Sequence, residues 1–306
     1  MIENLKALVV GYGSIGQRHS RLLRDMGMNV SIVSRREIPA EQCFSSVAEA
    51  LATGAFDYVV VANETADHAA AVDALLGEGY SGRVLIEKPV SSKVASMDVT
   101  GFAGSAVGYN LRFHPVLSAL HDALARKKLL SMQIYCGQYL PTWREGRDYR
   151  RSYSAQAQGG GALRDLSHEL DYALWLGGAW KRVAALGGHV SNLEIESDDS
   201  FMLLLELERC SMATVQVNYL DRPGRREIVV NAEEHTYRAD LVQGILETDG
   251  VACKFSIDRD ATMIAQHRAA LASDYRLLCT LAEGEAVVRL IDAANRAVAD
   301  KIWVVA

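Results

Sequence analysis

Three glycines near the N-terminus constrain the fold of this chain more than any other feature of the sequence. Gly11, Gly13 and Gly16 have the spacing G-x-G-x-x-G and directly follow the apolar run 5–10. In this pattern the first glycine permits a tight turn, the second lets the backbone approach a pyrophosphate, and the third lets helix and strand pack closely. The amide groups that open the following helix then face the phosphates. A tight turn without a ligand is the alternative, and the position between a strand and a helix favours dinucleotide binding.

The first third of the chain alternates apolar runs with helical stretches, as βαβ units around a parallel sheet do. We expect strands at 5–10, 29–33, 57–62, 83–86 and 105–109, with helices from the glycine turn to about 26 and from about 65 to 77–79.

Beyond about residue 112 the pattern changes, because strand-like runs then follow one another directly. We expect strands at 130–139, 183–189, 200–207, 211–219, 226–232 and 235–242, and helices at 165–176 and 285–301. The sequence therefore predicts an α/β Rossmann domain over 1–112. An α+β domain over 113–306 would follow, with a mostly antiparallel sheet covered by helices on one face.

Composition excludes several classes of partner. The chain has 32 Lys and Arg against 38 Asp and Glu, a net charge of −6, so no basic surface calls for nucleic acid or an anionic membrane. Apolar runs such as 58–62 are far shorter than the ~18 residues that span a bilayer, and a strand from residue 5 leaves no room for a signal peptide. The five cysteines are scattered without a C-x-x-C pair, which disfavours a disulfide frame. We expect a cytoplasmic protein.

The end of the second expected strand bears on the choice of dinucleotide. NAD enzymes carry Asp or Glu about 20 residues after the glycine turn. This chain has Ser34, Arg35 and Arg36 there, and Glu37 is the first acid after the strand. A hydroxyl group and guanidinium groups suit the 2′-phosphate of NADP, whereas solvated loop arginines are the alternative. The sequence therefore favours NADP over NAD.

Two further segments have the residue types for catalysis. Lys88 follows the strand 83–86, at an edge of the sheet where ligands bind, and its ammonium group can stabilise charge on a substrate oxygen. Asp165, His168 and Asp171 share one face of the helix 165–176, so an imidazole there can act as acid or base beside carboxylates. A surface lysine and an acidic helix face are the alternatives, and a single histidine without cysteine disfavours a metal. We take the remaining histidines as isolated structural or solvated groups: His19, His114, His121, His189, His235 and His267.

Taken in order, these segments resemble the glucose–fructose oxidoreductase/inositol dehydrogenase/MocA (Gfo/Idh/MocA) family. The matching segments are VVGYGSIGQRH (9–19), VVVANETADHAAAV (59–72), VLIEKPVS (84–91), VGYNLRFHP (107–115) and GGGALRDLSHELDYALWLGG (159–178). The resemblance implies an NAD(P)-dependent oxidoreductase acting on a sugar or sugar derivative. It also implies a Rossmann domain followed by an open-faced sheet domain that forms homodimer or homotetramer contacts.

The resemblance implies roles for individual residues. Lys88 matches the family's catalytic lysine, His168 matches its acid/base histidine, and the peptide bond before Pro89 is expected to be cis. The sequence departs from the family in two places: two residues instead of three separate Asp165 from His168, and the segment 91–104 is shorter than the usual crossover helix. Dinucleotide contacts are expected at Gly11, Gly13, Ser14, Ile15, Gly16, Ser34, Arg35, Arg36, Asn63, Thr65, His68, Glu87, Lys88 and Asn110. Substrate contacts are expected at Lys88, Tyr149, Arg150, Tyr153, Arg164, Asp165 and His168.

The leading hypothesis is an NADP-dependent dehydrogenase or reductase of a sugar, amino sugar or sugar nucleotide. Lys88 would polarise the substrate oxygen. His168 would take the hydroxyl proton from the substrate or return it, and Asp165 would assist as a neighbouring carboxylate. Arg147 or Arg150 would bind a phosphate or carboxylate of the substrate. A regulator that senses NADP or a sugar with the same fold is the alternative of another class. A reductase of a non-sugar substrate, such as a linear tetrapyrrole or an imine, is a third hypothesis.

Overall fold

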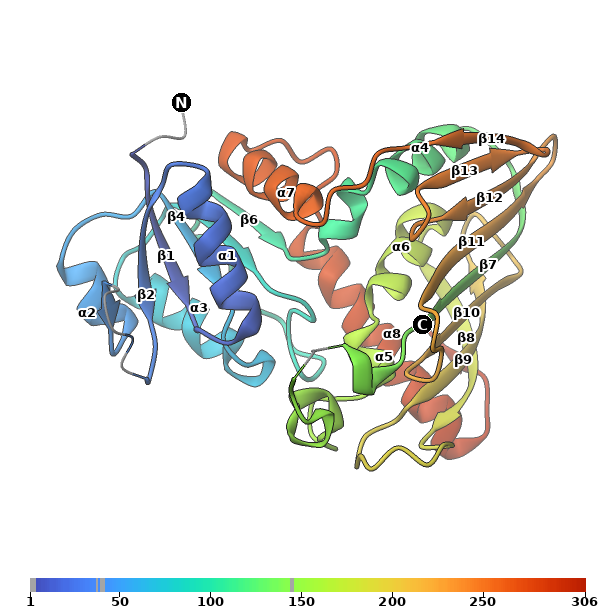
Figure 1. The fold of residues 1–306 in the computed structure, drawn as a ribbon, viewed down its shortest axis with the longest axis horizontal. Helices are drawn as coiled ribbons and strands as arrows, with labels where there is room; N and C mark the ends of the chain where they lie inside the picture. The colour runs from blue at the N-terminus through green and yellow to red at the C-terminus, as the bar shows by residue number, and fades with distance from the viewer. Residues whose placement is uncertain (1–3, 37, 39–41, 144–145) are drawn as a thin grey trace. The chain divides into compact units, whose positions relative to one another are not determined.

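The computed structural model describes residues 4–36, 38, 42–143 and 146–306, and the chain divides into two compact units. The first unit comprises Met1–Phe113 and Asp258–Glu285, and the second comprises His114–Ile257 and Ala286–Ala306. The sequence predicts one boundary, between residues 112 and 113, whereas the chain returns to the first unit after the second sheet. The return segment includes α7 (Ala261–Ala272), which lies beside α1 (Ser14–Asp25) in Figure 1. Burial drives the return, because α7 buries Met263, His267 and Ala270 in the first unit.

A six-stranded parallel sheet forms the centre of the first unit. The strand order is β3-β2-β1-β4-β5-β6, and every neighbouring pair is parallel. The strands are β1 (Lys6–Val10), β2 (Asn29–Val33), β3 (Cys43–Phe44), β4 (Tyr58–Val61), β5 (Arg83–Ile86) and β6 (Gly104–Val107). The order reverses between β1 and β4, and ligands of such sheets bind outside the carboxyl ends of the strands at this point. The predicted Rossmann fold is confirmed.

Helices cover both faces of the parallel sheet. They are α1 (Ser14–Asp25), α2 (Val47–Ala52), α3 (His68–Gly77) and α7, with the 3₁₀ turns η1 (Thr65–Asp67) and η2 (Asn110–Phe113). α1 contacts α7, whereas α2 contacts α3. The segment between β5 and β6 is short, as the sequence indicates, and contains no helix. Instead, Phe102 packs its ring 5.9 Å from that of Tyr80, just after α3.

A nine-stranded sheet forms the second unit, in the order β14-β13-β12-β11-β7-β10-β9-β8-β15. β7 and β10 are parallel, and the other neighbouring pairs are antiparallel, so the predicted mostly antiparallel sheet is confirmed. The strands are β7 (Leu129–Gly137), β8 (Trp180–Gly188), β9 (Ser200–Leu207), β10 (Ala213–Asn218), β11 (Arg225–Ala232), β12 (Thr236–Asp240), β13 (Ile245–Thr248), β14 (Val251–Lys254) and β15 (Val304–Val305).

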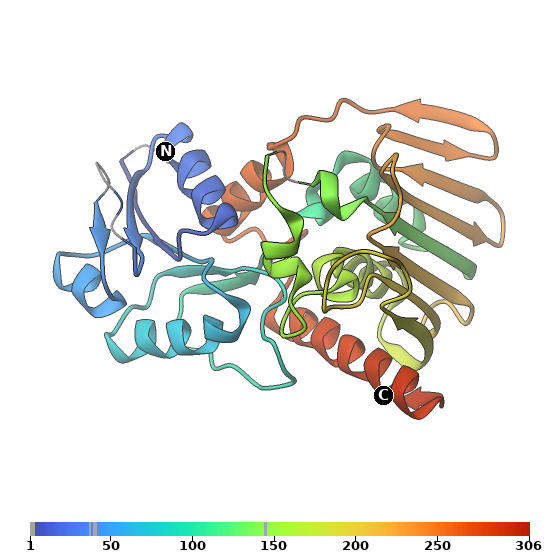
Figure 2. The same ribbon diagram turned by 60° about the horizontal axis from the view of Figure 1, so that its bottom comes forward.

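Helices lie on one face of the second sheet (Figure 2). They are α4 (Pro115–Leu124), α5 (Ala162–Asp165), α6 (His168–Gly177) and α8 (Leu281–Asp300), with η3 (Leu140–Thr142), η4 (Tyr149–Arg151) and η5 (Tyr153–Ala155). The single helix that the sequence predicts at 165–176 is two helices, because Leu166 ends α5 and Ser167 precedes α6. Among the described residues, no helix has both the length and the apolarity to cross a bilayer.

Candidate functional site

The glycine turn after β1 leaves an open space beside the backbone. Gly11 has φ +99°, and a Cβ atom there would lie 2.5 Å from Cα of Asn63. A Cβ atom on Gly16 would lie 2.1 Å from the carbonyl oxygen of Gly11, whereas one on Gly13 would meet no atom within 4 Å. Close packing of the backbone therefore requires the first and third glycines. The second faces free space, as close approach of a pyrophosphate demands.

The start of α1 is suited to an anion. Gly13 is the N-cap, no side chain caps the helix, and its first turn, which contains Ser14 and Ile15, carries no acidic residue. The amide groups of an uncapped first turn provide hydrogen-bond donors and a partial positive charge. A dinucleotide pyrophosphate fits this arrangement.

Asn63, which follows β4, carries an unused hydrogen-bond acceptor. Its Nδ2 atom donates to the Asp67 carbonyl oxygen at 3.2 Å, whereas its buried Oδ1 atom has no hydrogen-bond partner among the described residues. Buried polar atoms are normally hydrogen-bonded, so Oδ1 is suited to accept from a bound ligand. Thr65 lies beside it in η1.

His68 has a structural place in this loop. Its ring nitrogens lie 3.2 Å from the Val90 carbonyl oxygen and 3.3 Å from that of Asn63. Burial lowers the pKa of His68, so its ring is neutral near pH 7. The ring braces the Asn63 loop against the segment after β5, and its dinucleotide contact stays a prediction.

At the end of β2, the predicted phosphate contacts are on the surface. The Ser34 hydroxyl accepts a hydrogen bond from the Arg36 amide at 3.0 Å. The guanidinium group of Arg35 is 89% exposed and lies 3.2 Å from Asp67 Oδ2. Glu37 lies outside the described residues. Arg35 is therefore a solvated cation whose ion partner is itself partly exposed.

Lys88 is half-buried at the carboxyl end of β5, and its peptide bond to Pro89 is cis, as the resemblance implies. The preceding carboxylate of Glu87 is buried: Oε1 lies 2.8 Å from His19 Nε2, and Oε2 accepts the Lys88 amide at 3.1 Å. Burial raises the pKa of Glu87, but the hydrogen bonds from His19 and from the Lys88 amide, with the charge of Lys88, outweigh it and leave the pKa below its usual value. Asn110 donates to the Thr262 hydroxyl of α7 at 2.6 Å.

In the second unit, α5 presents a carboxylate that a tyrosine holds in place. Asp165 Oδ2 accepts the Tyr219 hydroxyl at 2.7 Å. Asp198 accepts the Leu163 amide at 2.9 Å, and burial, with a smaller contribution from the charge of Asp165, raises the pKa of Asp198 to about 6. The third glycine of the run, Gly161, has φ +103°, and a Cβ atom there would lie 2.1 Å from Asp198 Oδ1.

His168 is the first residue of α6 and is half-buried. The next residue, Glu169, is fully buried and accepts hydrogen bonds from Arg226 Nε at 2.7 Å and from the Tyr172 hydroxyl at 3.0 Å. This ion pair anchors the start of α6 to β11. Sequence reasoning missed it, because Arg226 follows Glu169 by 57 residues and no spacing links them.

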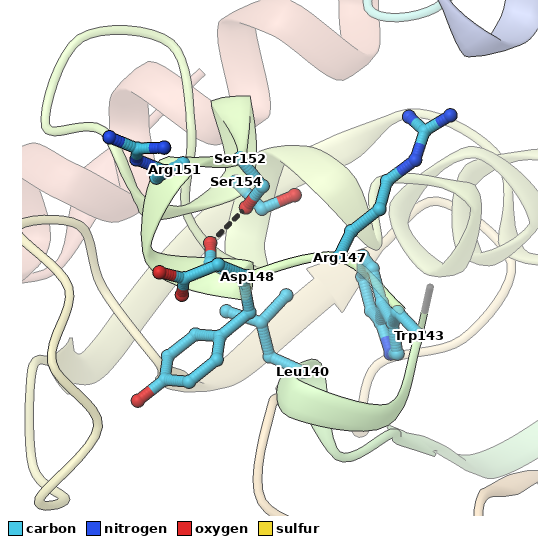
Figure 3. A pocket seen from close by; sticks show the side chains of 8 residues that line it. Leu140, Trp143, Arg147, Asp148, Arg151, Ser152 and Ser154 are labelled. Atoms are coloured by element: carbon cyan, nitrogen blue, oxygen red, sulfur yellow. Dashed lines mark hydrogen bonds between the residues drawn. The ribbon is translucent and has the colours of Figure 1, made fainter. Parts of the chain in front are cut away.

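The loop after η3 forms a cavity of about 320 Å³ (Figure 3). Arg147 lines it, with Trp143 on the same side and Asp148 and Arg151 across from them. The other lining residues are Leu140, Tyr149, Ser152 and Ser154. The sequence left open whether Arg147 or Arg150 binds an anion, and only Arg147 lines this cavity.

The guanidinium group of Arg150 is held away from the cavity by carboxylates. It bonds Asp148 at 2.8 and 3.0 Å and Glu194 at 3.1 Å. Tyr153 lies beside the glycine run, where a Cβ atom on Gly159 would lie 2.3 Å from its hydroxyl oxygen. Arg164 has a buried Nη1 atom without a hydrogen-bond partner among the described residues, which makes it a second candidate to bind substrate oxygen.

The remaining histidines are not all isolated: His235 Nδ1 lies 2.6 Å from Asp249 Oδ2, the His121 ring stacks on that of Trp175, and two buried histidines contact each other. His19 and His267 bond to each other, with 2.9 Å between His19 Nδ1 and His267 Nε2. They are separated by 248 residues, so no local pattern indicates the contact. Across the described ranges, no group of three or more His, Cys, Asp or Glu side chains is placed to hold a metal ion.

Two family models match this chain. "Oxidoreductase family, NAD-binding Rossmann fold" matches residues 5–100, and "GFO/IDH/MocA C-terminal domain" matches residues 127–238. Together they span more than half of the chain. No curated protein matches the sequence.

Solved structures of similar fold cover nearly the whole chain. GenD2 from gentamicin A biosynthesis, in complex with NAD, is 23% identical, covers 100% of this chain and 97% of its own, and has a TM-score of 0.82. The WlbA dehydrogenase from Bordetella pertussis, in complex with NADH and UDP-GlcNAcA, is 18% identical, with coverages of 99% and 98% and a TM-score of 0.79. A levoglucosan dehydrogenase in complex with NADH is 17% identical, with coverages of 99% and 99% and a TM-score of 0.82. At these identities the likeness shows a shared fold.

The open space at Gly13 predicts that a substitution there weakens dinucleotide binding without lowering the stability of the fold. We expect Gly13→Ala to unfold at nearly the same temperature as the unmodified chain and to bind NAD(H) and NADP(H) at least about tenfold more weakly, because the methyl group occupies the space beside the turn. Calorimetric titration and thermal unfolding measure the two effects. Gly11→Ala is the matched control, and its positive φ and 2.5 Å approach to Asn63 should lower the free energy of unfolding by about 1–3 kcal/mol. Undiminished binding by Gly13→Ala would contradict this assignment.

Proposed function

Because the chain belongs to the Gfo/Idh/MocA family of NAD-binding oxidoreductases, we propose that it transfers a hydride between a nicotinamide dinucleotide and a carbon atom of a sugar, amino sugar or sugar nucleotide. The observation that carries the dinucleotide half is the glycine turn, in which Gly11 and Gly16 are packed against backbone and Gly13 faces open space. The sugar half is supported by WlbA, which is bound to UDP-GlcNAcA, and by the arginines and tyrosine of the cavity.

In this proposal, one group of residues binds the dinucleotide and another stabilises charge and transfers the proton. The turn Gly11–Gly16 and the start of α1 bind the pyrophosphate, and Asn63 Oδ1 accepts a hydrogen bond from the dinucleotide. When bound, the nicotinamide ring supplies the hydride acceptor or donor. Lys88 donates to the substrate oxygen and stabilises the negative charge that develops there. His168 takes the hydroxyl proton in oxidation and returns it in reduction, with Asp165 as its carboxylate partner.

Substrate recognition in this proposal belongs to the loop after η3 and to α5. Arg147 and Arg151 offer paired donors for a phosphate or carboxylate, and Tyr149 and Trp143 offer ring surfaces at the same cavity. Arg164 Nη1 contributes the buried donor that lacks a protein partner in the described chain.

Removal of either proposed catalytic group should abolish turnover without loss of cofactor. We expect Lys88→Ala and His168→Ala to lower kcat by about 10²–10⁴, because general acid–base and charge stabilisation are worth that much. Dinucleotide Kd should stay within about threefold of the unmodified value. Nicotinamide absorbance across free sugars, amino sugars and sugar nucleotides gives the rate. His235→Ala is the control, because it removes a half-buried histidine just before β12, where it lies 2.6 Å from Asp249.

Two outcomes would redirect the assignment. Near-full activity in His168→Ala would remove His168 from the mechanism. Tight dinucleotide binding without turnover of any sugar would favour the regulator that the sequence left open, or a reductase of a non-sugar substrate.

We further propose that the cofactor is NADP(H), with NAD(H) as its competitor. Ser34, Arg35 and Arg36 follow β2, and Arg35 has an exposed guanidinium group whose Asp67 partner a phosphate can replace. We expect kcat/KM to be higher with NADP(H), and Arg35→Ala to lower it about tenfold or more with NADP(H) while NAD(H) is unaffected. Arg276→Ala, which removes an 86% exposed arginine of the same unit, is the control. An equal effect of Arg35→Ala on both cofactors would contradict the proposed phosphate contact.

We also propose that two copies of the chain associate through the second sheet. Leu186 faces Met202 across β8 and β9, and these side chains are 76% and 51% exposed. With Leu204 and Trp303 they line an apolar groove of about 680 Å³, which a second copy would cover. The unmodified chain should sediment as a dimer or tetramer, and a Leu186→Lys, Leu204→Lys double variant as a single chain. Val251→Lys, at the far edge of the sheet, is the control, and a monomeric unmodified chain would contradict the proposal.

A further inference from the structure

Four buried side chains of the first unit form a continuous hydrogen-bonded chain. The Tyr58 hydroxyl lies 3.0 Å from His267 Nδ1, His267 Nε2 lies 2.9 Å from His19 Nδ1, and His19 Nε2 lies 2.8 Å from Glu87 Oε1. The two imidazoles and the phenol are 0% exposed, and the glutamate is 8% exposed. The rings meet edge to face, with centroids 4.9 Å apart between the histidines and 5.7 Å between His267 and Tyr58.

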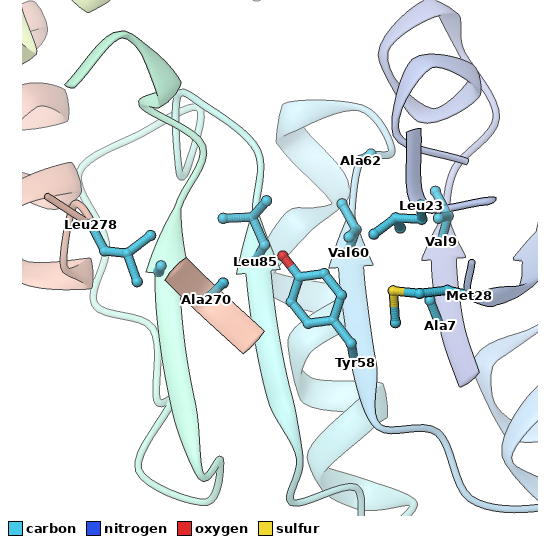
Figure 4. Packing of buried hydrophobic residues seen from close by; sticks show 11 residues of the cluster. Ala7, Val9, Leu23, Met28, Tyr58, Val60, Ala62, Leu85, Ala270 and Leu278 are labelled. Atoms are coloured by element: carbon cyan, nitrogen blue, oxygen red, sulfur yellow. The ribbon is translucent and has the colours of Figure 1, made fainter. Parts of the chain in front are cut away.

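The four residues come from segments that are distant in sequence. Tyr58 starts β4, His19 lies on α1, Glu87 follows β5, and His267 lies on α7, the helix that returns after the second sheet. In Figure 4 the Tyr58 ring reaches from β4 toward the segment of α7 that carries Ala270. Nothing in the folding of a βαβ unit requires polar groups at these core positions, and burying them is costly unless every one is bonded.

The protons of this chain can be arranged in one direction only. The ionised Glu87 accepts, so His19 carries its proton on Nε2, and its Nδ1 must accept from His267 Nε2. Burial holds the pKa of His267 well below its usual value, so this ring is neutral and its Nδ1 accepts from Tyr58. The reverse order would leave the Tyr58 hydroxyl proton without an acceptor, because His267 is its one hydrogen-bond partner in the described part of the chain.

The hydrogen-bonded series of four side chains ends at Glu87, beside the proposed catalytic Lys88. The second oxygen of Glu87 accepts the backbone amide of Lys88 at 3.1 Å, and the positive charge of Lys88 favours the carboxylate form. The other titratable groups that interact with Glu87 are His19, His68 and Tyr58. Gly108 leaves room for the carboxylate, since a Cβ atom there would lie 2.8 Å from Glu87 Oε1.

We propose that Tyr58, His267 and His19 are positioning residues that hold the Glu87 carboxylate in one orientation, and that Glu87 in turn fixes the backbone and the positive charge of Lys88. The inference rests on the proposed function only in calling Lys88 catalytic. It also gives the return of α7 a role in the site, because α7 supplies His267. Arg18 and Arg21 of α1 fix the start of that helix by binding Asp260, with contacts of 2.7 Å to its two carboxylate oxygens.

The arrangement of protons is measurable without catalysis. In the protein labelled with ¹⁵N-histidine, long-range proton–nitrogen spectra at pH 7 should show the Nε2 atoms of His19 and His267 as protonated and their Nδ1 atoms as hydrogen-bond acceptors, with signals assigned from His19→Gln and His267→Gln. Tyr58→Phe keeps the ring and removes the last donor, so the His267 signal should change while the fold is retained. An Nδ1 proton on either ring would overturn the proposal.

The effect on Lys88 is measurable by chemical labelling. An amine-reactive reagent, read by peptide mass spectrometry, should modify Lys88 roughly threefold to tenfold faster in Glu87→Gln, because the neutral amide no longer attracts and holds the Lys88 ammonium group. Exposed Lys93 is the internal reference. Gln266→Leu, a buried neighbour on α7 that bonds the Val107 carbonyl oxygen, should leave the labelling rate and both histidine signals unchanged.

Kinetics complete the test. Tyr58→Phe and His267→Gln should lower kcat about 10- to 100-fold, as expected when a reacting group is slightly misplaced, with dinucleotide Kd nearly unchanged. The two proposals fail differently. If labelling and proton positions follow the prediction but no sugar is turned over, the proposed function fails and the positioning chain stands. If Lys88→Ala abolishes turnover but Glu87→Gln leaves the labelling of Lys88 unchanged, the positioning chain fails.

Discussion

The parallel sheet of the first unit has to be covered on both faces, because its strands bury side chains on both sides. Tyr58, Val59, Val60 and Val61 are consecutive residues of β4, and all four are 0% exposed. α1 and α3 belong to the connections that follow β1 and β4, but the connection from β5 to β6 forms no helix. α7 contacts β5 and β6, so this part of the parallel sheet is covered by residues that follow the nine-stranded sheet in sequence. The return of the chain at Asp258 follows from that requirement.

Local patterns predicted the parts of the fold that local chemistry determines. The glycine turn and the apolar runs of β2, β5 and β9 appear with the expected boundaries, because each strand is a run with buried positions next to a turn. The hairpin of β13 and β14 was missed, although Asp249 and Gly250, with φ 50° and 87°, form the Asp-Gly turn that favours such a hairpin. α7 was missed because its buried face mixes Met263 and Ala270 with Gln266 and His267, which weakens the apolar periodicity.

The candidate site divides in the same way. Spacing predicts Gly13 and Lys88 as site residues from their place after a parallel strand, and the structure places them after β1 and β5. Spacing did not identify which arginine lines the loop cavity, because that depends on Asp148 and Glu194, which neutralise Arg150 and leave Arg147 at the cavity. Nor did it find the partner of Glu87, because His19 lies 68 residues earlier and is brought to it by the packing of α1 on the sheet.

The buried hydrogen-bonded series from Tyr58 to Glu87 has the form of a proton wire, but it does not conduct protons. A concerted shift of its three protons would neutralise Glu87 and leave Tyr58 as a buried phenolate. Burial raises the pKa of Tyr58 well above its usual value, and the charges of Tyr80 and Glu87 raise it further, so that shifted state is strongly disfavoured. The hydrogen-bonded series therefore fixes the orientation of the Glu87 carboxylate without transferring protons. In the proposed mechanism, the proton that His168 exchanges with solvent does not pass through these residues.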